Sequence, residues 1–258
     1  MATNLLIAYP DIGLKATLTS PPATATGYNA NNIIAGPRSD LWKANATATD
    51  HAWIFDLGAS TTSSVSYALL DRSPLLYKQA STSIGKVYLY GSTDGISWGS
   101  ILHTLTSQSS SLVGPQSDIT VGTLTATTAF RYWRANVQAS DASTLQAVTG
   151  KIYFGTMFDM GREPIAPRMA TRSTKQGQPR ETANILNLTW EGITNTTVQN
   201  FIDKIVKIKD TSVLYLYAPT YTPILFGWTV FPCWLRSCEV STDWYDRNTI
   251  KATFEEAV

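Results

Sequence analysis

The sequence predicts a mainly β protein, in which an N-terminal jelly-roll β-sandwich precedes a small β-barrel or sheet domain with one amphipathic helix. Over the first 158 residues, short apolar or alternating runs are separated by clusters of Ser, Thr, Gly, Asn and Pro, and no long run of helical period interrupts them. After residue 180 a single stretch of helical period lies among further strand-like runs. With 258 residues, of which 43% are hydrophobic, the chain is long enough to bury two cores.

The strands expected in the N-terminal domain, residues 1–158, are short. Their apolar side chains alternate or run continuously at strand length. Polar clusters such as 19–27 and 104–116 are typical of the loops between them. The predicted strands are Trp53–Leu57, Ser64–Tyr67, Lys86–Tyr90, Phe130–Val137 and Lys151–Phe154.

Residues 159–180 are the most basic part of the chain, contain several prolines and show almost no periodicity. This composition predicts an extended linker or arm. It is either a solvated connection or an arm that becomes ordered on a neighbouring subunit, and its cation content favours the arm. The cations expected to serve assembly are Arg162, Arg168, Arg172, Lys175 and Arg180.

Residues 181–258 predict a strand, a helix and then a meander of strands. Thr196 and Gln199 have the spacing of a capping box, which is typical of a helix start. Apolar residues then recur at helical spacing, at Val198, Phe201, Ile202, Ile205 and Ile208. The predicted strands are Ile185–Trp190, Val213–Tyr217, Ile224–Trp234, Arg236–Val240 and Thr249–Glu255.

The charge pattern excludes several classes of partner. Only 15% of the residues are charged and the net charge is +1, so the chain lacks the clustered cations that nucleic acid or an anionic membrane would require. No apolar run approaches the ~20 residues of a membrane span, and the start does not resemble a signal peptide. We therefore expect synthesis in the cytoplasm, without membrane insertion. Cys233 and Cys238 are expected to be free thiols.

The sequence offers no recognisable catalytic group. A histidine base would have to be His51 or His103, and neither is accompanied by a nucleophile signature. The carboxylates considered for a glycosidase pair are scattered among predicted strand ends and turns, at Asp56, Asp71, Asp94, Glu239 and Asp243. No phosphate-binding loop or metal-ligand set is present. We expect no enzyme activity, no cofactor and no metal.

Four motifs in the N-terminal half occur in the order and approximate spacing of one family. They are Gly27–Gly36 leading to Leu41-Trp42, then Trp53–Gly58, Tyr88–Trp98 and Arg131–Arg134. Together they resemble the discoidin, or coagulation-factor type C, family of galactose-binding-like β-sandwiches, over roughly residues 8 to 157. The residues themselves predict a tight turn at Asp94-Gly95, with Trp98 restarting a strand, and an ion pair between Asp56 and Arg131 or Arg134.

The resemblance implies ligand binding by loops at one end of the sandwich, here residues 27–42 and 72–82. Exposed aromatic rings would stack on sugar rings, while Asn, Asp and Arg would bond hydroxyls. The bridging cysteines frequent in the family are absent, and no dense acidic loop indicates Ca²⁺. A protein-docking platform is the alternative use of the fold. The candidate glycan-binding residues are Tyr28, Asn32, Arg38, Asp40, Trp42, Arg72 and Tyr77.

The C-terminal half, by its element order alone, resembles the ring-forming domains of siphophage distal-tail and tail-tube proteins. This resemblance implies a homo-oligomeric ring, a trimer or hexamer, built by an inserted arm and by sheet continuation at Val213–Tyr217 or Thr249–Glu255. The density of aromatic residues between 215 and 245 exceeds what a small domain easily buries, so some should face a partner.

These observations lead to two hypotheses of different class. The first is a virion structural protein of the phage tail tip, a distal-tail or baseplate ring with the sandwich on the outside and the tail tube, hub or baseplate proteins as partners. The second is a carbohydrate-binding adhesin that recognises a host surface glycan through the N-terminal loops. The two can coexist in one protein.

Overall fold

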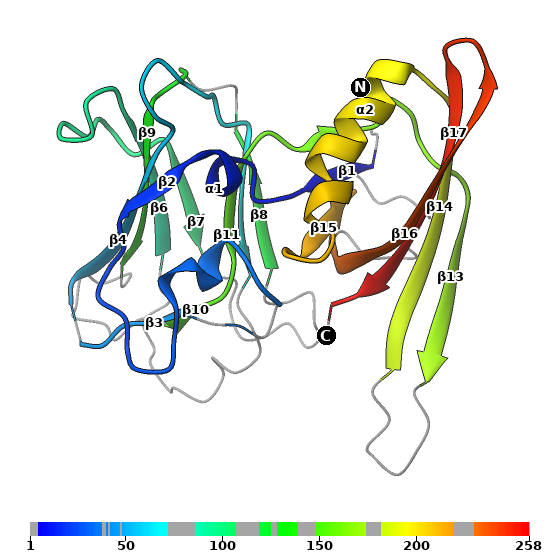
Figure 1. The fold of residues 1–258 in the computed structure, drawn as a ribbon. Coiled ribbons are helices and arrows are strands. Elements are labelled where there is room, and N and C mark those ends of the chain that lie inside the picture. The colour runs from blue at the N-terminus through cyan, green and yellow to red at the C-terminus, as the bar shows by residue number, and fades with distance from the viewer. Residues whose placement is uncertain are drawn as a thin grey trace. The chain divides into compact units, whose positions relative to one another are not determined.

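The computed structural model describes residues 5–37, 40, 42–46, 48–71, 86–106, 119–124, 128–138, 148–173, 182–218 and 230–257 (Figure 1). The chain forms two compact units. Residues 10–157 make up one, the sandwich unit, and residues 1–9 together with 158–258 make up the other, the sheet unit. The sandwich unit is therefore inserted into the chain of the sheet unit.

The sandwich unit is built from antiparallel sheets. A five-stranded sheet has the order β2-β4-β9-β6-β7, a three-stranded sheet the order β11-β5-β8, and β3 pairs with β10. Its elements are α1 (Asp11–Lys15), β2 (Thr17–Ser20), η1 (Ala30–Ile33), β3 (Trp42–Lys43), β4 (Asp50–Asp56), β5 (Tyr67–Asp71), β6 (Lys86–Ser92), β7 (His103–Thr106), β8 (Ile119–Thr123), β9 (Tyr132–Gln138), β10 (Val148–Thr149) and β11 (Ile152–Gly155).

One apolar cluster forms the core of the sandwich unit. Strict alternation in β4 buries Trp53 and Phe55, and alternation in β9 buries Trp133. The rings meet edge to face, as Phe55 does with Phe154 at a centroid distance of 5.2 Å, which is a favoured aromatic geometry. The prediction of an N-terminal β-sandwich is confirmed. Trp98, expected to restart a strand, instead lies outside the strands.

The sheet unit is one antiparallel seven-stranded sheet with the order β12-β1-β15-β16-β17-β14-β13. Its side chains form a second core with α2, which confirms the predicted β domain with one helix. Its elements are β1 (Leu6–Ala8), β12 (Phe158–Asp159), β13 (Ile165–Ser173), β14 (Thr182–Ile193), α2 (Asn195–Lys204), η3 (Val206–Ile208), β15 (Leu214–Tyr217), β16 (Val230–Trp244) and β17 (Arg247–Glu256).

The helix starts earlier than its predicted capping box. Thr194 is the N-cap, and its hydroxyl accepts a hydrogen bond from the backbone N–H of Thr197 at 3.2 Å. The Thr194 hydroxyl thus gives an acceptor to a backbone N–H at the helix start that has no partner within the helix. The predicted cap at Thr196 was expected to play the same role. The apolar face is as expected, because Phe201, Ile205 and Ile208 are buried in the core. The last of these lies in η3, a tighter continuation of the helix.

The predicted domain limits require two corrections. Residues 6–8 form β1, which pairs with β12 and β15 inside the sheet unit and does not belong to the sandwich. Part of the predicted linker, Ile165–Ser173, is a strand that pairs with β14, while residues 174–180 lie outside the described residues. Pro167 is compatible with this strand because β13 is at the sheet edge and its register shifts between Ile165 and Arg168.

The edges of the sheet also differ from those predicted. β15 lies between β1 and β16, and β17 lies between β16 and β14, so neither can extend the sheet to a neighbour. Among the described strands, the edges are β12 and β13. The predicted strands 224–234 and 236–240 are continuous from Val230 onward within β16, across a bulge between Leu235 and Ser237, and residues 224–229 lie outside the described residues. β16 and β17 form one long hairpin, seen at the upper right of Figure 1.

Candidate functional site

The loop residues predicted to bind sugar are dispersed. Trp42 is fully buried, and its indole N–H donates to the Thr24 hydroxyl at 2.9 Å. It packs edge to face against Trp53 at 4.6 Å, so it belongs to the core and cannot stack on a sugar. The prediction of an exposed ring was wrong because Trp42, on the short strand β3, faces the same core as β4.

Of the other predicted residues, Tyr28 is exposed, at 42%. Asn32 and Asp40 are half-buried, on either side of the turn at Ala35 and Gly36. Arg38, Arg72 and Tyr77 lie outside the described residues. The structure therefore brings no two of the predicted side chains into a shared, described pocket.

The buried side chain of Lys151 holds the backbone of the loop between Asn32 and Asp40. The Lys151 ammonium donates to the backbone carbonyls of Asn32 at 2.6 Å, Ala35 at 2.5 Å and Asp40 at 3.4 Å. Burial lowers the pKa of Lys151 to about 8, and the charges of Asp40 and Asp71 oppose that shift. Lys151 directly precedes β11, so a core strand positions the loop that the sequence marked as ligand-binding.

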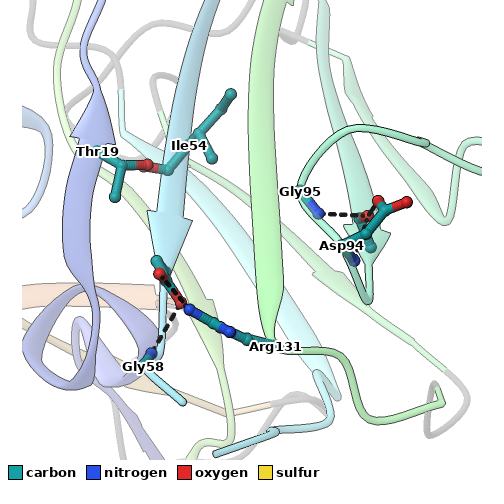
Figure 2. Close-up of polar contacts among 8 residues, drawn as sticks. Thr19, Ile54, Gly58, Asp94, Gly95 and Arg131 are labelled. Atoms are coloured by element: carbon teal, nitrogen blue, oxygen red, sulfur yellow. Dashed lines mark hydrogen bonds and ion pairs between the residues drawn. The ribbon is translucent and has the colours of Figure 1, made fainter.

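Two polar motifs of the sandwich are structural (Figure 2). Arg131 donates to both carboxylate oxygens of Asp56, at 2.8 and 2.9 Å, which confirms the predicted pair. This bidentate contact lowers the pKa of Asp56. In the turn after β6, Asp94 accepts from the backbone N–H of Ile96 and Ser97, and Gly95 has a φ of 74°. These hydrogen bonds hold the pKa of Asp94 far below its usual range.

The outer face of the five-stranded sheet carries a different group of side chains, which we call the sheet platform. Its register places Ile54, Arg134 and Tyr90 in one row across β4, β9 and β6. The next row holds Asn136 beside Tyr88. The platform consists of Asp50, Tyr88, Tyr90, Trp98, Arg134 and Asn136.

Arg134 is the centre of the sheet platform. Its guanidinium carbon lies 5.6 Å from the ring centroid of Tyr90 and 5.9 Å from that of Trp98, within cation–π range. One of its terminal nitrogens donates to the Asp50 carboxylate at 3.1 Å. Because Asp50 pairs with Gln138 and not with Arg134 itself, the arginine side chain must extend along β9 past Asn136 to reach it.

The sheet platform has unused hydrogen-bonding capacity. Asn136 is almost fully buried, and its amide donates to Asp50 at 3.4 Å, yet its carbonyl oxygen has no partner among the described residues. The Nε of Arg134 is likewise without one there. Unpaired polar atoms at buried positions are uncommon in folded proteins, and each calls for an explanation such as local strain or a bound water or ion.

Two of the five basic residues predicted to form an arm belong to a strand. Arg168 and Arg172 lie in β13, and Arg162 precedes it. Lys175 and Arg180 lie outside the described residues. The pairing of β13 with β14 corrects the expectation of an irregular segment, and whether these cations contact a neighbour stays a prediction.

Several carboxylates considered for catalysis make structural contacts. Asp56 and Asp94 serve the contacts given above, and Asp243 accepts from the Thr249 hydroxyl at 2.5 Å. Burial raises the pKa of the Cys233 thiol, which disfavours its reactive form. Within the described ranges, no three His, Cys, Asp or Glu side chains gather into a group that could hold a metal ion. None of the described helices has the length and apolar character needed to cross a membrane.

Comparisons with known proteins give limited likeness. No protein-family model matches the chain, and no curated protein matches its sequence. Among solved structures, CBM32-1 from a family 31 glycoside hydrolase of Clostridium perfringens has a TM-score of 0.40 at 15% identity and covers 57% of this chain and 99% of its own. The C-terminal domain of a chitobiase from Bacteroides fragilis has a TM-score of 0.40 at 15% identity, with coverages of 55% and 95%. The fold described above rests on the strand pairing of this chain alone.

Proposed function

We propose that this is a non-catalytic carbohydrate-binding protein whose sandwich unit holds a sugar on the sheet platform. The observation that carries this proposal is the position of Arg134 between two half-buried aromatic rings and a carboxylate. This arrangement joins an apolar ring surface to polar groups of fixed orientation. Ligand sites in proteins commonly combine these properties.

The platform is suited to the two kinds of surface that a sugar presents. The faces of Tyr90 and Trp98 offer apolar area to the C–H faces of a pyranose ring. Asp50, whose side chain is 42% exposed, can accept hydrogen bonds from hydroxyl groups, while the Arg134 guanidinium can donate them. The ring contacts keep Arg134 in one orientation, which reduces the entropy lost when a ligand binds.

The charge of the platform favours a neutral sugar. Asp50 and Arg134 compensate each other, so no net charge attracts an acidic or a basic ligand. Binding would depend on ring stacking and on hydroxyl hydrogen bonds, and only weakly on salt. We therefore expect neutral hexose-containing glycans on an array to be preferred over sialylated or sulfated ones.

The test is binding of the full-length chain to a glycan array, followed by calorimetry with the best ligand. Trp98→Ala and Arg134→Met should each weaken binding at least about 10-fold, since each removes one of the contacts that define the platform. Ile96→Ser is the matched control. Ile96 lies in the same turn as Trp98 and is 83% exposed, so its loss should leave affinity unchanged.

A loop variant distinguishes the platform from the predicted loop site. Tyr28→Ala removes the exposed ring of the 27–42 loop and leaves the platform intact. Loss of binding in Tyr28→Ala, with retention in Trp98→Ala, would move the site to the loops and overturn the platform. Absence of binding to any glycan on the array would remove the carbohydrate function altogether.

A second candidate function is assembly, as a structural protein of a phage tail tip found in the virion. The observation that favours it is the tip of the β16–β17 hairpin, where Trp244 and Tyr245 are 80% and 91% exposed. Exposed rings of this kind are typical of protein interfaces. A tail-tip ring could carry the carbohydrate-binding unit as its adhesive part. Labelling of purified virions with antibody against the sheet unit would test this location.

A further inference from the structure

The turn between β16 and β17 presents two adjacent aromatic rings to solvent. Trp244 and Tyr245 are the most exposed of the large aromatic side chains in the described part of the chain. Val240, on the same hairpin, is 41% exposed. Single exposed apolar residues are ordinary, but two neighbouring rings at the end of a hairpin form a compact apolar projection. We call this pair the tip.

The tip is held in place by hydrogen bonds to the start of α2. The Asp246 carboxylate accepts from the backbone N–H of Asn195 at 2.7 Å. The side-chain amide of Asn248 donates to the Asn195 side chain at 2.9 Å and to the Ile193 carbonyl at 3.0 Å. The backbone of the turn is thus fixed although its rings are free, so a partner would meet an ordered projection and lose little entropy in binding it.

The same sheet has a hollow of about 470 Å³ on its outer face. Ile185 from β14, Thr253 and Glu255 from β17 and Arg236 from β16 line it. Arg236 donates to Glu255 at 2.5 Å across the hollow. The volume is within the ~300–1,000 Å³ usual for pockets that take up a ligand or a large side chain.

The tip and the hollow are chemically complementary. The indole of Trp244 can pack on the aliphatic side chain of Ile185, while the Arg236 guanidinium offers a cation to a ring face. The chain cannot make this contact with itself. Thr253 is separated from Arg247 by roughly 20 Å of extended, fully paired strand, which holds the tip away from the hollow.

We propose that the tip of one copy of this chain inserts into the hollow of a second copy, so that the protein associates head to tail. Such a heterologous contact uses two different patches, and it repeats until a ring closes or a filament forms. The proposal specifies the subunit contact of the assembly role and does not depend on sugar binding.

The size of the tip predicts a weak contact. A buried Trp or Tyr covers about 150–250 Å², so the tip supplies roughly half of the ~800 Å² per partner found in stable interfaces. Association should therefore depend on concentration. The full-length protein is expected to be monomeric when dilute and to increase in mass over the highest accessible concentrations, as measured by sedimentation equilibrium and light scattering.

Two variants and their mixture test the proposal. Trp244→Ser removes the tip, and Ile185→Trp fills the hollow, so each alone should remain monomeric at every concentration. In an equimolar mixture one tip and one hollow remain compatible, and a dimer, but nothing larger, should form. Val240→Ser, on the same hairpin outside the tip, is the matched control and should associate like the unaltered chain.

Three results would overturn the proposal. They are an unaltered protein that is monomeric at all concentrations, a Trp244→Ser variant that associates normally, and a mixture that remains monomeric although both variants are folded. If Ile185→Trp does not fold, Trp244→Ser with the control still decides the matter. Because glycan binding is measured separately on the sandwich unit, a failed assembly test leaves the carbohydrate proposal standing.

Discussion

The sandwich-unit loop that contains Asn32, Ala35 and Asp40 and the turn at Tyr245-Asp246 of the sheet unit are held in different ways. The loop converges on the buried Lys151 ammonium, which three backbone carbonyls surround. The turn is fixed to the first residue of α2 by the exposed Asp246 and by the nearly buried Asn248 of β17. The loop is therefore held by a buried charged group, Lys151, whereas the turn is held by an exposed carboxylate and an uncharged amide.

This difference determines how each segment should respond to change. A buried charge carries a desolvation cost and leaves expensive unpaired groups when it is removed. Hydrogen bonds near the surface can be replaced by water, so the loss of one costs little. The loop should therefore be sensitive to substitution of a single residue and to pH, while at the turn the loss of the buried Asn248 should cost more than the loss of the exposed Asp246.

The largest effect is expected for Lys151→Met. The substitution removes the Lys151 donor from three carbonyls, at about 1–3 kcal/mol each, and removes the cost of burying the charge, so we expect a net loss of roughly 3 kcal/mol. Urea unfolding at pH 7 measures it. Lys86→Met, at a half-buried surface position in the same unit, is the control. A loss of less than 1 kcal/mol would show that the loop does not need its anchor.

The pH dependence of the same pair of proteins sharpens the comparison. The pKa of Lys151 is about 8 in the folded protein and 10.5 in the unfolded chain, so the unfolded chain binds more protons between these values. The free energy of unfolding of the unaltered protein should therefore contain a contribution that rises from pH 8 to 10.5. Lys151→Met should lack it, so the gap between the two proteins should widen across that window. Parallel curves would contradict the burial of a charged Lys151.

An intermediate effect is expected for Asn248→Ala in the turn. Asn248 is nearly buried, and its amide is a donor to both Ile193 and Asn195. Its loss leaves a buried carbonyl unpaired, which should cost about 2 kcal/mol. Hydrogen exchange followed by mass spectrometry should show faster exchange in the first turn of α2. Unchanged exchange there would mean that the turn and the helix are not coupled through this residue.

The smallest effect is expected for Asp246→Ala. It removes one exposed acceptor at the helix N-terminus, which should cost between about 0.5 and 1 kcal/mol. Thermal unfolding of the full chain gives the change, with Asp246→Asn as the comparison that retains an acceptor. A cost near that of Lys151→Met would mean that the surface network is as critical as the buried anchor and would remove the distinction between the two segments.

Much of the fold was predictable because its strands alternate strictly. β4 and β9 lie where alternating apolar residues predicted strands. α2 lies where the spacing of Phe201 and Ile205 predicted a helix. β1 was missed because it is only three residues long and its partners lie at 158–159 and 215–217, far along the chain. β13 was missed because Pro167 argues against a strand, and the sequence does not show that this strand lies at a sheet edge and contains a bulge.

The candidate site was less predictable, since it depends on register. Arg134 and Tyr90 are 44 positions apart in the numbering, and only the pairing of β6 with β9 makes them neighbours. Trp42 had the composition of a sugar-stacking residue, but the sequence does not show that β3 faces the core. The Asp56 to Arg131 pair was predictable because a carboxylate at a strand end needs a cation nearby.

The insertion of the sandwich unit between β1 and β12 has a consequence for biosynthesis. β1 is synthesised before the sandwich, and its neighbour β15 is synthesised only after it. The sandwich is a contiguous stretch of chain, and the Thr156 backbone N–H near its end donates to the Asp11 carboxylate near its start at 3.0 Å. We therefore expect the sandwich to fold before β1 pairs with β15. Residue 7 pairs with residue 158, so a short turn in place of residues 10–157 would leave an ordinary hairpin. The sandwich is thus a contiguous insertion between two paired strands of the sheet unit, and insertions with close ends are commonly tolerated in folded domains.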